Sequence, residues 1–217
     1  MTGLLLLLAM AGRHKEPAAP AQIPEIRPLA APADFASKIA AAYQGGQTPA
    51  ASVVPICRLL AEQLSLCFVK GTAGSLDYAT ATDLGAWGLD ADQLYERAKT
   101  AAQQGFSDTR PGLAAVEGMS GRYWVSAEAD GLDAAGLLYP ERLAQIAGGQ
   151  PVVAVPVQGA LLFWVPGDGD FDKVMAVAVR RMYDGSAQKV SPLIYRWQDT
   201  HWAVWGQAVK DGDRLGP

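Results

Sequence analysis

Histidine is almost absent from the sequence, and with it most local motifs for metal binding and catalysis. Of the 217 residues only His14 and His201 are histidines, so a zinc site or a Ser-His-Asp triad would depend almost entirely on His201. His201 lies in or beside the turn of the last predicted hairpin, where a solvated polar residue is ordinary. The dinucleotide-binding GxGxxG, Walker-type, GxSxG and HExxH patterns do not occur. We therefore expect no cofactor, no metal ion and no catalytic residue, and the balance favours a protein that is not an enzyme.

Charge is also scarce. Charged residues make up 18% of the chain and the net charge is −4, so the sequence lacks the basic patch that holds a phosphate backbone. Gly85-Ala-Trp-Gly88 has the bare GxxG form of KH domains. Trp87 and the nearby carboxylates of Asp83 and Asp90 are, however, unsuited to gripping phosphates. We expect no nucleic-acid binding, and a loop before a capped helix at this segment.

No apolar run is long enough to cross a bilayer. Leu4 to Leu8 are followed by Ala9-Met10-Ala11, which has the small-x-small form of a signal-peptidase site, although no basic residue precedes the run. Residues 1–11 are a candidate signal peptide, which predicts a periplasmic or membrane-tethered protein, with a cytoplasmic protein as the alternative. Prolines recur among alanines over residues 12–33, which favours an extended tether. Residues 34–217 then form a single domain.

The only two cysteines are Cys57 and Cys67. They would stay reduced in the cytoplasm but should pair if the chain is exported. If residues 52–58 and 64–70 form an antiparallel hairpin, the two cysteines face each other directly across it, within reach of a disulfide. The alternative is a helical turn over residues 59–64, which would leave two small buried hydrophobic side chains.

What the sequence does contain is a repeated order of two strands and one helix. Predicted helices cover residues 35–43, 90–104, 133–147 with an interruption at Pro140, and 171–183. Predicted strands cover residues 52–58, 64–70, 77–82, 113–117, 122–127, 152–157, 160–165, 193–197 and 202–207. We expect an α+β fold, with a predominantly antiparallel sheet built from hairpins, repeated ββα elements and helices on one face. Val152 to Val155 are apolar throughout, which predicts a strand covered on both faces.

Aromatic side chains are concentrated in the predicted hairpins. Strand alternation puts Tyr123 and Trp124 on opposite faces of the sheet, and likewise Phe163 and Trp164. One face should meet the helices, and the other would be an apolar surface of a kind that soluble monomers rarely leave open. Either residues 34–58 or a second subunit cover it, or it binds a partner. The candidate binding residues are Trp124, Trp164, Tyr195, Trp197 and Asp130.

The acidic run Asp168-Gly169-Asp170-Phe171-Asp172 resembles the first half of a calcium-binding loop. Lys173 stands where that loop needs glycine, and Val179 stands where it needs a bidentate glutamate. Capping of the following helix by Asp170 or Asp172 is the better interpretation, because carboxylates are favourable at a helix N-terminus.

Three segments carry a family resemblance. They read Gly121-Arg-Tyr-Trp-Val-Ser, Ala129-Asp-Gly-Leu-Asp-Ala-Ala and Gln150-Pro-Val-Val-Ala-Val-Pro. These segments resemble the YtpQ-like family of bacterial proteins, and the resemblance extends from about Val53 to Trp205. The resemblance implies the same order of strands and helices, but no reaction, because the molecular activity of that family is not established. The chain departs from the family at Val157-Gln158-Gly159, where a polar or acidic residue often follows the Val-Pro pair.

The leading functional hypothesis is an accessory or binding domain that contacts another protein or an extended peptide through its sheet. The rival is a small-molecule enzyme whose acid and base are carboxylates such as Asp130 and Asp133. A cleft with two close carboxylates would favour the enzyme, and an open apolar sheet face would favour binding.

Overall fold

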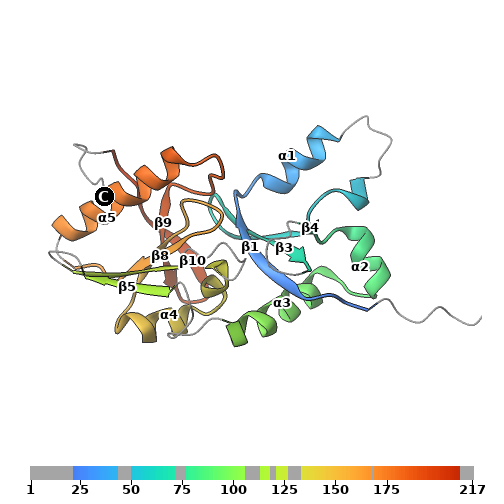
Figure 1. Ribbon diagram of the computed structural model, residues 1–217, viewed down its shortest axis with the longest axis horizontal. Helices are drawn as coiled ribbons and strands as arrows, with labels where there is room; N and C mark the ends of the chain where they lie inside the picture. The colour runs from blue at the N-terminus through green and yellow to red at the C-terminus, as the bar shows by residue number, and fades with distance from the viewer. Residues whose placement is uncertain are drawn as a thin grey trace, which may run out of the picture.

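The computed structural model describes residues 22–43, 50–71, 77–105, 113–117, 121–126, 133–167 and 169–210. Within these ranges the chain forms two antiparallel sheets and several helices, which confirms the α+β class. Figure 1 shows the six-stranded sheet with α5 (Gly169–Gly185) on the left, and the four-stranded sheet with α2 (Ala81–Trp87) and α3 (Ala91–Gly105) on the right.

The four-stranded sheet has the order β1-β3-β2, with β4 paired to β3. Its strands are β1 (Ile26–Ala31), β2 (Cys57–Ala61), β3 (Leu64–Lys70) and β4 (Asp77–Tyr78). β3 matches its predicted range, and every residue of it except Lys70 is buried. Helix α1 (Phe35–Ala42) and the short 3-10 helix η1 (Ala50–Ser52) lie between β1 and β2 in the chain.

Strand β1 shows that the predicted tether and domain boundary were wrong. All its residues are buried, and it pairs with β3 along its whole length, from Ile26 opposite Lys70 to Ala31 opposite Ser65. Residues 26–31 are therefore part of the domain and not of a spacer. The proline spacing indicated a spacer rather than a strand. Pro28 is tolerated here because β1 is the outermost strand of its sheet, where a missing N–H does no harm. The candidate signal peptide lies outside the described residues.

The six-stranded sheet has the order β10-β9-β7-β8-β6-β5. Its strands are β5 (Leu113–Glu117), β6 (Arg122–Ser126), β7 (Val152–Ala154), β8 (Leu161–Trp164), β9 (Leu193–Gln198) and β10 (His201–Gln207). β7 lies between β9 and β8 and all its residues are buried, so the prediction of a strand covered on both faces is confirmed. Val153 in the middle of β7 has no exposed surface.

Both faces of this sheet are covered. On one face Val152, Leu162 and Trp164 pack against α5. On the other face Val153 and Phe163 pack against the 3-10 helix η2 (Asp133–Leu138), helix α4 (Pro140–Ala147) and apolar residues of the four-stranded sheet. Helical segments therefore lie on both faces rather than on one, and the two sheets share a hydrophobic core.

The predicted strand 77–82 is shorter than expected: Asp77–Tyr78 form β4, and helix α2 begins at Ala81. Thr80 accepts a hydrogen bond from the backbone N–H of Asp83, and the Asp83 side chain accepts from the backbone N–H of Thr80, which is a capping box. Gly88 ends the helix in the left-handed conformation at φ 66°. The GxxG sequence is thus the end of a helix and not the expected loop.

Helix α5 begins at Gly169, so Asp170 and Asp172 lie in its first turn and the expectation that one of them caps it is wrong, whereas two other boundaries follow the sequence. Asp90 caps α3 through a reciprocal pair of hydrogen bonds with Gln93. The predicted interruption at Pro140 separates η2 from α4, where the proline occupies the first turn.

Candidate functional site

Three of the candidate binding residues belong to the core. Trp124 is 7% exposed, and Trp164 and Tyr195 have no exposed surface, so these side chains cannot contact a partner in this structure. Of the two alternatives, a covered face or a face that binds a partner, the structure has the covered one, because α5 covers one face and η2, α4 and the four-stranded sheet cover the other. Trp197 is half-buried, and Asp130 lies outside the described residues.

The buried aromatic residues use their polar atoms to join layers of the fold. Trp164 Nε1 donates to Asp172 Oδ1 at 2.9 Å, which fixes β8 to the start of α5. Trp202 Nε1 donates to the backbone oxygen of Leu137 at 3.0 Å, which fixes β10 to η2. A buried aromatic N–H needs such a partner, and here each partner lies on the neighbouring layer.

Tyr195 joins the two sheets. Its hydroxyl donates to the backbone oxygen of Glu62 in the β2–β3 turn at 2.7 Å, and it lies 2.6 Å from the Ser191 hydroxyl. Ser191 in turn accepts from the backbone N–H of Leu193 at 3.1 Å. Burial raises the pKa of Tyr195, more than the Ser191 hydrogen bond lowers it, so the phenol stays protonated and able to donate. Its role is structural.

Of the two carboxylates named in the enzyme hypothesis, Asp130 lies outside the described residues, so the structure describes only Asp133. Asp133 is buried and accepts a hydrogen bond from Ser126 Oγ at 2.5 Å, which joins η2 to β6. Asp172 is occupied by Trp164. Among the described residues no group of three or more His, Cys, Asp or Glu side chains is placed to hold a metal ion. Asp168 lies outside those residues.

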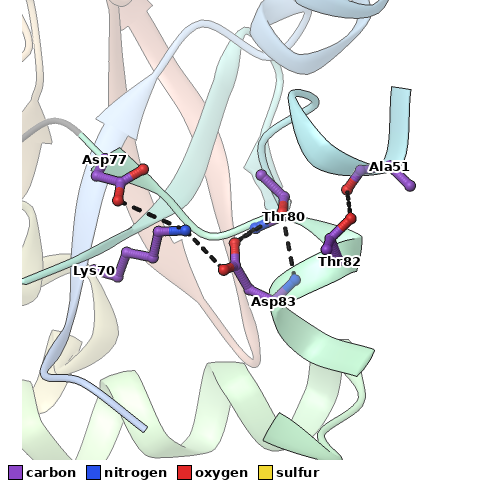
Figure 2. Close-up of polar contacts among 6 residues, drawn as sticks. All are labelled: Ala51, Lys70, Asp77, Thr80, Thr82 and Asp83. Carbon is purple, nitrogen blue, oxygen red and sulfur yellow. Dashed lines mark hydrogen bonds and ion pairs between the residues drawn. The ribbon is translucent and has the colours of Figure 1, made fainter. Parts of the chain in front are cut away.

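A polar cluster at the start of α2 brings two carboxylates to one lysine (Figure 2). Lys70 Nζ lies 2.7 Å from Asp83 Oδ1 and 3.6 Å from Asp77 Oδ2. Thr80 Oγ1 donates to Asp83 Oδ2 at 2.8 Å, and Thr82 Oγ1 donates to the backbone oxygen of Ala51. The cluster holds α2 against the ends of β3 and η1.

This cluster is better suited to folding than to acid–base chemistry. Burial alone would raise the pKa of Asp83, but the hydrogen bonds from Lys70 and Thr80 outweigh it and leave the pKa below its ordinary value. A general acid at neutral pH needs the opposite shift. Asp83 is therefore a permanent partner for Lys70 and a cap for α2.

The more open candidate is a cleft of about 320 Å³ between β2 and β10, which we call the β2/β10 cleft. These strands end the two sheets and lie next to each other. The cleft is lined by Arg58, Leu59, Leu60, Tyr95, Lys99, Leu137, Leu138, Pro140, Glu141, Trp197, Thr200, His201 and Trp202. Its size is at the lower end of the range for ligand sites.

The floor of the cleft is apolar and its rim is mostly basic. Leu137 and Trp202 are buried beneath it, and the rings of Trp197 and Trp202 meet edge-on with centroids 5.3 Å apart. Arg58, Lys99 and His201 contribute basic groups, whereas Glu141 is the one carboxylate among the described lining residues. Such a surface can hold an apolar group with a negative charge beside it.

Two of the few large apolar side chains that the described chain exposes lie on the strands that border this cleft. Leu59 of β2 is 66% exposed and Val204 of β10 is 41% exposed. Each strand pairs with a neighbour on one side only, and each has an irregular register, after Leu59 and after Val204. The outer side of each strand is therefore a potential pairing edge.

The β2 side of the cleft is fixed by a disulfide. Cys57 and Cys67 lie directly opposite each other in the β2–β3 hairpin, as the predicted register requires, with Cα atoms 3.9 Å apart and their sulfurs bonded. The strand itself begins at Cys57 rather than at residue 52. Cys57 immediately precedes Arg58, so the bond restrains the residues that border the cleft.

Of the sequence-predicted binding residues that the structure describes, only Trp197 lines this cleft, with His201 beside it. Arg58, Tyr95 and Lys99 were not recognised, and no local motif marks them. The one available signal was Arg58 itself, a charge within the apolar stretch Pro55-Ile-Cys-Arg-Leu-Leu-Ala61.

Comparisons with known proteins leave the chain without an assigned family. The resemblance to the YtpQ-like family stays an expectation. Neither family models, nor curated proteins, nor solved structures match the chain.

Proposed function

We propose that this protein is a binding module that holds an extended segment of a partner protein in the β2/β10 cleft. The observation that carries the proposal is the convergence of two sheet edges, each with an exposed apolar side chain, Leu59 and Val204. An edge strand presents unpaired backbone N–H and C=O groups, and an added strand can satisfy them. Side-chain contacts with the cleft would then supply selectivity.

Because both faces of the six-stranded sheet are covered, the proposed contact surface is the edge of a sheet and not one of its faces. Trp164 and Tyr195 are used up in packing and in hydrogen bonds between layers. Trp197 at the cleft is the aromatic residue of the original set that keeps partial exposure. The partner therefore contacts the edge strands β2 and β10.

We further propose that the protein functions outside the reducing cytoplasm. The Cys57–Cys67 disulfide supports this location, because such bonds persist mainly in oxidising compartments. The candidate signal peptide at residues 1–11 agrees with it. No helix in the described ranges has the length and apolar character of a membrane span.

Selection of random phage-displayed peptides on the immobilised, oxidised protein tests the binding function without assuming a sequence. Hydrogen–deuterium exchange of the complex then locates the peptide, and we expect slower exchange in β2 and β10. Leu59→Glu should abolish binding of the selected peptides, because it puts a charge on the proposed contact surface.

Val174→Glu is the matched control. Val174 is 62% exposed, close to the value for Leu59, but lies on α5 away from the cleft lining. It should leave binding unchanged. Peptides whose protection maps elsewhere, or whose binding survives Leu59→Glu, would contradict the proposed site.

A further inference from the structure

The charges of the β2/β10 cleft indicate which kind of segment it accepts, an inference that rests on the proposed function. We infer that the bound segment is acidic, with glutamate or aspartate side chains held by Arg58 and Lys99 and apolar side chains on the floor between them. The apolar floor and the basic rim each contribute one part of this specificity.

Arg58 is held in place before any ligand arrives. Its guanidinium carbon lies 4.1 Å from the centre of the Tyr95 ring, and its Nη1 lies 3.1 Å from Asp92 Oδ1. Stacking fixes the plane of the guanidinium, and a planar fork of N–H donors matches a carboxylate. Within the described residues the bond to Asp92 is the one hydrogen bond of this side chain, so further N–H donors are available to a ligand.

Lys99 and His201 extend the basic rim on either side of the cleft. Lys99 lies on α3 one turn after Tyr95, and His201 is the first residue of β10. Glu141 on α4 also lines the cleft, and its carboxylate disfavours an acidic group placed beside it, so it restricts where the acidic side chains of the ligand can lie. Two formally positive side chains, Arg58 and Lys99, and one carboxylate, Glu141, thus line the cleft on a chain whose net charge is −4.

The strand geometry sets the spacing of the ligand. A segment added along β2 or β10 would place alternate side chains on one face. Apolar residues could then enter over Leu137 and Trp202 while the acidic residues between them point to the rim. An alternating Glu-Leu peptide meets this requirement.

Fluorescence anisotropy with labelled, capped peptides tests the inference. The probes are an alternating Glu-Leu peptide, its Gln-Leu counterpart and its Lys-Leu counterpart. We expect the Glu-Leu peptide to bind at least about ten-fold more tightly than the Gln-Leu peptide, the scale of one hydrogen bond to a charged group, and more weakly as salt rises. The Lys-Leu peptide should bind most weakly.

Arg58→Gln and Lys99→Gln should each remove most of the preference for Glu-Leu over Gln-Leu. Lys173→Gln, which removes one positive charge from α5 away from the cleft, should leave it intact. Circular dichroism of each variant verifies folding before the binding comparison.

Equal binding of the Glu-Leu and Gln-Leu peptides, or a preference unchanged in Arg58→Gln, would overturn acidic selectivity. The proposed function would survive that result if peptides from the unbiased selection still protected β2 and β10 from hydrogen exchange. If the selected peptides did not protect these strands, the proposed function would be wrong as well. Binding of N-acetylglutamate as tight as that of the peptide would make a small carboxylate the ligand and overturn the assignment of a protein segment.

Discussion

Reduction of the Cys57–Cys67 disulfide should lower the stability of the domain by an amount that the structure sets. The two cysteines are ten residues apart in sequence, and the chain-entropy model gives about 2.7 kcal/mol at 25 °C for a closed loop of that length. For a domain of this size the change corresponds to a fall in melting temperature of about 5–10 °C. Because β2 pairs with β3 alone, the loss should be felt first in β2.

Urea unfolding of the oxidised and the dithiothreitol-reduced wild type measures the effect. Both forms retain both sulfur atoms, so the comparison isolates the cross-link from the packing of Cys67, which has no exposed surface. A Cys57→Ala/Cys67→Ala double variant should be insensitive to the reductant. A difference below about 1 kcal/mol between oxidised and reduced wild type would refute the reasoning, because the model allows no such small value for this loop.

Three further outcomes follow from the fold. A chain that starts at Gln22 keeps β1 and should melt at the wild-type temperature in calorimetry. A chain that starts at Ala33 lacks β1 and should fail to fold, because burial of Ile26 and Leu29 alone contributes about 1.5–3 kcal/mol each. A stable chain that starts at Ala33 would show that β1 is dispensable. Val153→Asp should prevent soluble expression because it buries an unpaired carboxylate, while Val204→Asp at 41% exposure should express normally; soluble, folded Val153→Asp would place β7 at an edge. Asp83→Asn should cost on the order of 1.5 kcal/mol at pH 7. Because the pKa of Asp83 is lowered in the folded state, the extra stability of the wild type over Asp83→Asn is present above the ordinary pKa near 3.8 and disappears as the pH falls below it. The same difference in free energy of unfolding at pH 7 and in acid, measured by urea unfolding, would contradict this.

The elements that the sequence predicts best are those with signals at both ends. α3 has Asp90 as its cap and ends at Gly105, and β3 is an unbroken buried run. β1 was missed because Pro28 and its alanine neighbours show no alternation. α2 was missed although Thr80 and Asp83 have the spacing of a capping box, because the preceding Asp77-Tyr78 strand seemed to continue through them.

The disulfide could be predicted even though the limits of β2 could not. In an antiparallel hairpin with a regular ladder, the centre of the hairpin fixes the opposed residues, whichever residues the strands begin and end with. A hairpin centred on Glu62 pairs Cys57 with Cys67 and Arg58 with Leu66, as observed. Next to the turn Ala61 pairs with Leu64 instead, because the register shifts after Leu59. The cleft has no such local rule, because Arg58, Tyr95 and His201 come together only through the tertiary packing of segments far apart in the chain.

The proposed binding edge would leave β2 paired on one side only, and the disulfide compensates for the missing neighbour. Under the proposed function β2 cannot gain a second strand partner of its own chain on its outer side, and in the structure it pairs with β3 alone. Its register is irregular after Leu59, within the part that borders the cleft. The Cys57–Cys67 bond secures β2 from its inner side and leaves its outer side free. Reduction should therefore weaken peptide binding more than it weakens the core around Val153, and hydrogen exchange that rises equally in β2 and β7 after reduction would contradict this division.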